Sequence, residues 1–487
     1  MNAATVAALG WRGRHIVICN WRDSGHPSAG GAELYCESVA TELHEAGVRV
    51  TYLTARAPGQ AAVEQTHYGT VVRVGSTYTV YPRALAWLAR HRAGIDGIID
   101  SQNGIPFFTP LAIRRRTPIA LLIHHVHQDQ FAVHFPAPVA RIGRFLENQA
   151  SRWVYTARTM AAVSPSSRAE IRRRLSLRGA VLLAPCGQDM PDRTDRPSAN
   201  PPGQDTPGRT RSAAANPRIV AVGRLVRQKR VDVLLRALPA VAAAVPGTEL
   251  HIAGDGEALP ELRQLAADLG LGDRVVFHGR VDDTTRDALV GSAWVTASAS
   301  MGEGWGLSVM EAAAAGVPAV AISVPGLRDT IRPGETGWLV PSVDDLAGGL
   351  VEALRTLSDP AVAAEWSRRC TTWAARFTWT ATADHLLSAL TAERDRLVRR
   401  GRERRPITDA ATVVTVPATV PPADLGLRVT DRVEVAEGQT KVLLYGADEQ
   451  DGRRVVERLG LARRGPRVRL ARHQDLLGWR TGGRGGL

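Results

Sequence analysis

The sequence predicts two doubly wound α/β domains in tandem, followed by a C-terminal appendage. Buried-strand patterns alternate with helical patterns along most of the 487 residues. The alternation stops at 187–217, a stretch rich in Pro, Ser, Asn, Asp, Gly and Thr, and then restarts. A chain of this length also needs two or more domains to bury its apolar residues.

These patterns divide the chain into five expected segments. They are a first α/β domain at 1–186, a disordered linker or insert at 187–217, a second α/β domain at 218–378, a last amphipathic helix at 379–400 and an appendage of unreadable function at 407–487.

The first domain opens with a strand, a glycine turn, a helix and a second strand. The apolar run at 15–20 is typical of a buried parallel strand, and the helix runs from the turn to Leu43. Gly30 and Gly31 in the turn let the backbone approach a ligand closely, although a tight turn alone also explains them. Further strands are expected at 48–53, 70–74, 97–100 and 118–124.

Three histidines, His124, His125 and His127, come where the strand at 118–124 should end. Ligands of open α/β sheets bind at the carboxyl ends of the strands. No acidic or cysteine partner has a spacing that suits a metal, so we expect no metal site. An imidazole that meets a sugar or a phosphate is the functional interpretation, and local hydrogen bonding in a loop is the alternative.

The segment 138–177 is predicted to be helical and strongly basic. Its arginines alternate with apolar side chains such as Ile142, Phe145 and Trp153. Such a pattern fits a peripheral contact with a membrane surface, and it also fits a solvated helix face.

The second domain repeats the alternation from 218. Its first strand, 218–222, leads into a turn that carries Arg224 and Lys229, and a helix follows at 231–245. Later strands are expected at 249–253, 275–278, 294–297 and 318–322. The pair Gly254-x-Gly256 is only a fragment of a dinucleotide fingerprint, so it gives little support to nicotinamide binding.

The stretch from Glu303 to Glu311 carries two carboxylates eight positions apart with a glycine-rich turn between them. Backbone N–H groups at such a helix start suit a phosphate, and carboxylates suit the hydroxyls of a sugar and a ribose. The alternative is a capping box, in which Ser308 caps the helix and Glu311 only bonds back to it. Arg224 and Lys229 should lie at the same sheet edge, where two cations could hold a diphosphate.

These motifs resemble the family 4 retaining glycosyltransferases, which have the GT-B fold. The resemblance covers about 14–398. The Glu-x7-Glu and Arg/Lys motifs are specific together, and the glycine motifs alone are not. The matching pieces are Gly30-Gly-Ala-Glu33, Val222-Gly-Arg224-Leu-Val-x-x-Lys229, Ala253-Gly-Asp-Gly256, Val275-x-Phe277-x-Gly279, Glu303-x7-Glu311 and Gly334-x-Thr336-Gly337-x-Leu-Val340.

The resemblance implies two Rossmann-like domains that face each other across a cleft, with the helix at 379–400 crossing back to the first. It implies transfer of a sugar from a nucleoside diphosphate with retention, without a metal or another cofactor. Domain closure would exclude water from the donor. The acceptor is not identified: lipid-linked, natural-product and small polar acceptors all fit.

The family pattern also implies a role for each matching residue. Arg224 and Lys229 would bind the diphosphate and help the phosphate leave, Glu303 would contact the transferred sugar, and Glu311 would bind the ribose. Backbone amides from Trp305, Gly306 and Leu307 would meet the sugar or phosphate, and Trp305 replaces a commoner smaller aromatic. Gly30 and Gly31 would approach the diphosphate. His124 occupies the register of a histidine near the reacting sugar, with His125 and His127 as competitors.

Composition narrows the function classes further. The net charge is +13, with arginine far more frequent than lysine, and no apolar run reaches the length of a membrane span. The four scattered cysteines and the absence of a secretory pattern at 1–10 favour a cytoplasmic protein, with peripheral contact at the inner face of the membrane as an option. The alternatives are a non-catalytic GT-B scaffold that binds carbohydrate or a partner, and a basic nucleic-acid-binding protein, which no recognised motif supports.

Overall fold

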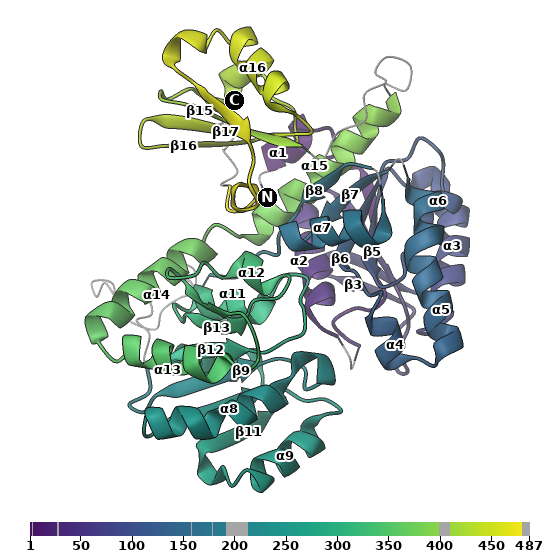
Figure 1. Cartoon of the computed structure of the whole chain (residues 1–487). Helices are drawn as coiled ribbons and strands as arrows, with labels where there is room; N and C mark the ends of the chain where they lie inside the picture. The colour runs from purple at the N-terminus through teal and green to yellow at the C-terminus, as the bar shows by residue number, and fades with distance from the viewer. Residues whose placement is uncertain are drawn as a thin grey trace, which may run out of the picture. The chain divides into compact units, whose positions relative to one another are not determined.

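The computed structural model describes residues 1, 3–26, 29–156, 158–177, 179–190, 213–398 and 410–479. The chain divides into two compact units (Figure 1). One contains Met1–Gly187 and Thr378–Leu487, and the other contains Gln188–Phe377. Most of the predicted linker at 187–217 and the arginine-rich runs at 399–405 and 480–487 lie outside the described residues.

The described part of the first unit is built on an eight-stranded sheet in the order β3-β4-β2-β1-β5-β6-β7-β8. All its pairings are parallel except that of β3 with β4. The first strand, β1, lies between β2 and β5, so the order reverses beside it. The strands are β1 His15–Cys19, β2 Arg49–Thr54, β3 Val63–Thr66, β4 Gly69–Arg73, β5 Gly97–Asn103, β6 Ile119–His125, β7 Thr159–Ala162 and β8 Val181–Leu183.

Helices connect β1 to β2, β4 to β5, β6 to β7 and β7 to β8, as expected for a doubly wound domain. The long helix α15, Trp379–Val398, belongs to the same unit and packs against α2, β6 and β7. The other helices are α1 Ala3–Ala8, α2 Gly31–Glu45, α3 Val80–His91, α4 Gln130–His134, α5 Ala137–Phe145, α6 Ser151–Tyr155 and α7 Pro165–Glu170, with π-helical segments η3 Leu146–Ala150 and η4 Ile171–Leu175.

The prediction of one helix over 138–177 was wrong. The helical run ends at Tyr155, and the buried strand β7 separates it from α7. Thr159-Met-Ala-Ala is a short apolar run, and an interior strand of a parallel sheet needs such a run because both of its faces are covered. Two arginines of the second half have internal roles: Arg158 pairs with Glu393 at 3.0 Å, and Arg168 is buried.

The second unit holds a described sheet of six parallel strands in the order β11-β10-β9-β12-β13-β14. Again the first strand of the unit, β9, lies between the strand that follows it and a later one, here β10 and β12. The strands are β9 Arg218–Val222, β10 Glu249–Ala253, β11 Val275–Gly279, β12 Val295–Ser298, β13 Ala319–Ile322 and β14 Gly337–Val340.

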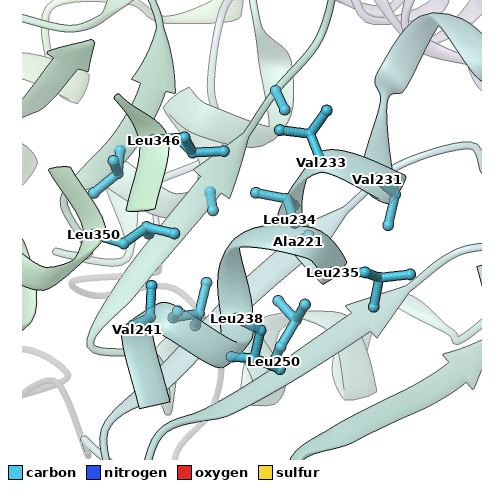
Figure 2. Close-up of a cluster of buried hydrophobic side chains, with 14 of the residues drawn as sticks. Ala221, Val231, Val233, Leu234, Leu235, Leu238, Val241, Leu250, Leu346 and Leu350 are labelled. Carbon is cyan, nitrogen blue, oxygen red and sulfur yellow. The ribbon is translucent and has the colours of Figure 1, made fainter. Parts of the chain in front are cut away.

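The core of this unit lies between the sheet and the helices α8 and α13 (Figure 2). Leu234, Leu238 and Val241 of α8 are buried with Leu346 and Leu350 of α13 over the strand residues. The helices are α8 Val231–Ala244, α9 Leu259–Asp268, α10 Asp283–Gly291, α11 Leu307–Ala314, α12 Leu327–Thr330, α13 Leu346–Thr356 and α14 Pro360–Ala374. This packing fixes the strand ends from which the functional loops emerge.

The appendage forms an antiparallel sheet in the order β16-β17-β15-β18, covered by α16. Its small core joins Val414, Val442 and Leu444 to Val456 of α16. Its elements are β15 Ala411–Val416, β16 Arg432–Ala436, β17 Gln439–Tyr445, α16 Glu449–Arg458 and β18 Arg467–Leu470. The predicted fold class, two Rossmann-like sheets and a C-terminal appendage, is confirmed.

Among the helices that the structure describes, none combines the length and the apolar character that crossing a bilayer requires.

Candidate functional site

The turn after β9 presents Arg224 at the carboxyl edge of the second unit's sheet. The Gly223 amide donates to Ala253 O at 3.0 Å, and the Leu225 amide donates to Asp255 O at 2.9 Å. A Cβ on Gly254 would come within 1.8 Å of Gly223 O, so this glycine is needed for close packing of the two loops. The Gly254-x-Gly256 fragment therefore has a role in shaping the Arg224 turn, and the Arg224 side chain is exposed.

The loop after the neighbouring strand β12 is joined to this turn. The Met301 amide donates to Gln228 O at 3.0 Å, and Gln228 Nε2 donates back to Gly302 O at 3.2 Å. Lys229 Nζ then meets Glu303 Oε1 at 2.5 Å, with 29% and 17% of the two side chains exposed. The cation and the carboxylate are thus side by side and still accessible. They lie where the strand order reverses, which is the usual ligand position in such sheets.

Helix α11 begins directly after this loop. Its N-cap is Gly306, which has a φ of 109° and no side chain to cap the helix. Ser308 is the second residue of the helix, so the capping-box interpretation of Ser308 and Glu311 was wrong. The first backbone N–H groups of α11, including that of Leu307, therefore have no side-chain cap. They lie at the positive end of the helix dipole, and this arrangement suits an anion.

Glu311 lies one turn into α11, and the charges of Arg286, Asp283 and Asp287 on α10 act on its carboxyl group. Burial raises the pKa of Glu311, and the positive charge of Arg286 opposes that rise. Arg286 also pairs with Asp283 at 2.8 Å and Asp287 at 2.9 Å. The carboxylate of Glu311 thus has a nearby cation that favours its ionised form, in which it accepts hydrogen bonds from hydroxyl groups.

The side chain of Trp305 packs inside the second unit. Its indole is 3% exposed and lies edge-on to Phe377, with ring centroids 5.1 Å apart. Phe377 in turn packs on Trp373 at 4.9 Å. The ring therefore supports the glycine-rich loop from inside, and only the backbone of Trp305 remains to meet a ligand.

In the first unit, Gly30 forms the N-cap of α2 and Gly31 is its first residue. The Gly30 amide donates to Glu33 Oε2 at 2.7 Å, and Arg22 Nε donates to Glu33 Oε1 at 3.1 Å. Glu33 is 1% exposed. The carboxylate thus holds the glycine turn in place through a buried ion pair.

The three histidines differ in their surroundings. His124 is buried, with its Nε2 2.9 Å from Ser101 Oγ. The Ser101 hydroxyl donates its proton to Asn20 Oδ1, so His124 Nε2 must be the donor to Ser101. Burial, helped by His127, lowers the pKa of His124 to about 3, so its imidazole is neutral. His125 and His127 are half-buried and lie edge to face, with ring centroids 5.3 Å apart.

A buried carboxylate supports the loop that carries His127. Glu147, on the π-helical segment η3, accepts the His127 amide at 2.6 Å and Gln128 Nε2 at 2.5 Å. Burial raises the pKa of Glu147 to about 7, although both of these hydrogen bonds lower it. His127 Nδ1 lies 2.9 Å from His125 O, which fixes the orientation of the ring.

Sequence reasoning named Glu33 only as part of the glycine-loop match and missed its supporting role, and it missed Glu147, Gln128, Gln228 and Arg286 altogether. Glu33 could have been found, since it stands three positions after Gly30 in a helix-start pattern. The remaining supporting residues contact residues that are distant in the sequence, or their position depends on a π-helical turn. No local sequence pattern predicts such contacts.

The two units thus define a class of protein: paired doubly wound domains, the second carrying cations, carboxylates and a helix N-terminus at one sheet edge. Two family models match the chain. "Glycosyltransferase Family 4" matches residues 29–191, and "Glycosyl transferases group 1" matches residues 206–369. The chain belongs to glycosyltransferase family 4, and it is a retaining enzyme of the GT-B fold that depends on a nucleoside-diphosphate sugar.

Similar proteins agree with this family. A GDP-mannose-dependent alpha-(1-6)-phosphatidylinositol monomannoside mannosyltransferase from Mycolicibacterium smegmatis is 28% identical over 76% of the chain and 97% of its own length. A D-inositol 3-phosphate glycosyltransferase from Mycolicibacterium vanbaalenii is 41% identical over 35% of the chain and 40% of its own length. The family match thus favours an enzyme over a non-catalytic scaffold and over a nucleic-acid-binding protein.

Solved structures share the fold. Sucrose-phosphate synthase from Thermosynechococcus elongatus has a TM-score of 0.60 and 24% identity, and the match covers 80% of the chain and 98% of that structure. Anabaena Alr3699/HepE, solved with UDP and glucose, has a TM-score of 0.56 and 18% identity over 77% of the chain and 99% of that structure. At these identities the match concerns the fold alone.

Proposed function

We propose that this chain transfers a hexose, with retention, from a nucleoside diphosphate to a hydroxyl of an inositol-phosphate acceptor carried by a membrane lipid. The pairing of Lys229 with Glu303 beside the start of α11 carries the donor half of the proposal. The acceptor half is supported by the relative that matches over 97% of its length, whose named acceptor is a phosphatidylinositol mannoside. Inositol 3-phosphate is the named acceptor of the second relative.

In this proposal each donor residue has one task. Arg224 and Lys229 bind the diphosphate, helped by the amides of Gly306 and Leu307. Glu303 accepts hydrogen bonds from the transferred sugar. Because Lys229 and Glu303 are already in contact, one donor molecule can meet both: its phosphate oxygen takes an N–H of Lys229 while a sugar hydroxyl donates to Glu303.

Glu311 binds the ribose hydroxyls, and the positive charge of Arg286 opposes the rise that burial causes in the pKa of its carboxyl group. The residues of the first unit keep the roles that the family pattern implies: Gly30 and Gly31 for the diphosphate and a histidine for the reacting sugar. His124 is buried and neutral, so the accessible imidazoles of His125 and His127 are the stronger candidates for direct contact.

The reaction proceeds on one face of the sugar. The bond between the anomeric carbon and the β-phosphate oxygen breaks, and the acceptor oxygen bonds to the same face of that carbon. The acceptor proton passes to the departing phosphate oxygen, so no protein nucleophile is needed. Arg224 and Lys229 stabilise the negative charge that grows on the phosphate as it leaves.

The test measures nucleoside diphosphate release from UDP-, GDP-, ADP- and dTDP-hexoses, with wild type beside Glu311→Ala. We expect slow hydrolysis of one donor and a loss of it in the variant. Free inositol 3-phosphate and phosphatidylinositol in detergent micelles are then added as separate acceptors. Glycosylation of the lipid but not of the free phosphate supports the proposal, and glycosylation of the free phosphate alone contradicts the lipid-linked acceptor.

A further inference from the structure

Four large apolar side chains are exposed together on α5 and α6, and we name them the α5–α6 patch. Val139 is 49% exposed, Ile142 59%, Phe145 43% and Trp153 74%. The two helices follow one another along one side of the first unit (Figure 1), joined by η3. Isolated exposed apolar residues are normal on a protein surface, but a contiguous group of this size marks an interaction surface.

The opposite side of α5 is seated firmly on the fold. Ala140 and Gly143 are buried, and a Cβ on Gly143 would come within 2.6 Å of the Phe131 ring. The small residues of α5 therefore contact the rest of the first unit, and its large apolar residues point outward. This is the reverse of a helix whose apolar face fills a core.

The π-helical segment η3 aligns the two halves of the patch. In a regular α-helix the residue at i+8 lies about 80° around the axis from residue i. The wider turn of η3 changes this phase. Trp153 consequently packs edge-on against Phe145, with ring centroids 5.6 Å apart. A shallow hollow beside Trp153 is lined by Gln149, Arg152 and Thr156.

The exposed charged residues of α5 and α6 have one sign. Arg141, Arg144 and Arg152 are exposed, whereas Glu147, the acidic residue of this segment, is buried beneath it. A row of apolar and aromatic side chains flanked by arginines is complementary to a bilayer with anionic lipids. The rings enter the boundary between head groups and acyl chains, and the guanidinium groups meet the phosphates.

We infer that the α5–α6 patch docks this enzyme on an anionic lipid bilayer, with Ile142, Phe145 and Trp153 inserted at the interface. The inference deepens the proposed function, on which it rests, by naming the surface that brings the enzyme to a lipid acceptor. The segment concerned ends at Tyr155, so the docking surface is much shorter than the basic helix that the sequence predicts.

The experiment is co-sedimentation of the full chain with vesicles of phosphatidylcholine, alone or mixed with phosphatidylglycerol, without donor or acceptor. We expect binding to the anionic vesicles that weakens with salt. The double variant Ile142→Glu/Trp153→Glu should lose this binding by about tenfold or more. The variant Arg141→Ala should lose about fivefold. The matched control is Val63→Glu, since Val63 is 58% exposed on β3 of the same unit and should bind like wild type.

Three results would overturn the inference. The first is wild-type protein that does not bind anionic vesicles. The second is an Ile142→Glu/Trp153→Glu variant that binds as well as wild type. The third is wild-type protein that self-associates through the patch, with dimers lost in the double variant and no vesicle binding. Donor hydrolysis without vesicles is measured for every variant, so a failed donor site and a failed docking surface are told apart.

Discussion

Both Rossmann-like units have a turn after the first strand of their sheet, and in both units a cation after that strand pairs with a glutamate. The two ion pairs differ in how far they are exposed. In the first unit Arg22 and Glu33 pair with only 9% and 2% of their side chains exposed. In the second unit Lys229 and Glu303 pair with 29% and 17% exposed. The buried pair of Arg22 and Glu33 holds the glycine turn in place. The second remains available to a ligand, which explains how one fold provides both a support and a binding site.

The largest effect on donor turnover is expected at Lys229. The variant Lys229→Ala removes the cation proposed to stabilise the leaving phosphate, and donor turnover should fall by about 10²–10³-fold. Its midpoint of urea unfolding should change little, since the pair is partly exposed. The matched control is Arg227→Ala, a cation two residues away that pairs with the exposed Glu261. A control that loses as much turnover as Lys229→Ala would mean that general positive charge, not this site, binds the donor.

The opposite pattern is expected at Glu33. The variant Glu33→Gln leaves Arg22 as a buried charge without its counterion, so the free energy of unfolding should fall by about 2–3 kcal/mol. Urea denaturation measures this change. The surface variant Glu64→Gln, on the edge strand β3, is the comparison, because its carboxylate is half exposed. Equal losses for the two variants would contradict the distinction between a structural and a ligand-facing ion pair.

A smaller effect, dependent on pH, is expected at His124. Its pKa is about 3 in the folded protein against 6.5 for a free imidazole, so below pH 6.5 the unfolded chain binds a proton that the folded chain does not. The stability of wild type should therefore fall as pH decreases, by about 2 kcal/mol at pH 5 relative to pH 7 from this group. In His124→Asn this contribution is absent. Urea denaturation of both proteins from pH 5 to 8 gives the difference, and parallel curves would show that His124 is not buried as a neutral ring.

The correct and the wrong sequence predictions have a common explanation. The predictions of the strands that precede both glycine turns, of the helix from Val231 and of the helix from Trp379 were confirmed, because local periodicity indicates these elements. The prediction of one helix over 138–177 was wrong because four residues inside this basic segment, Thr159–Ala162, form a strand. The prediction that Ser308 caps the helix was wrong because the N-cap is Gly306, two residues earlier, and Ser308 already lies inside the helix.

By itself, the sequence determined the class of fold and the sheet edge at which the charged motifs meet, because strand and helix periods and glycine turns are properties of neighbouring residues. Only the tertiary structure decided what each charge does. Lys229 meets Glu303 across 74 positions of sequence, Glu311 is placed near Arg286 of another helix, and His124 is enclosed by Ser101 and Tyr35. Burial and pairing between distant residues set whether a polar group supports the fold or remains available to a ligand, and no local pattern contains that information.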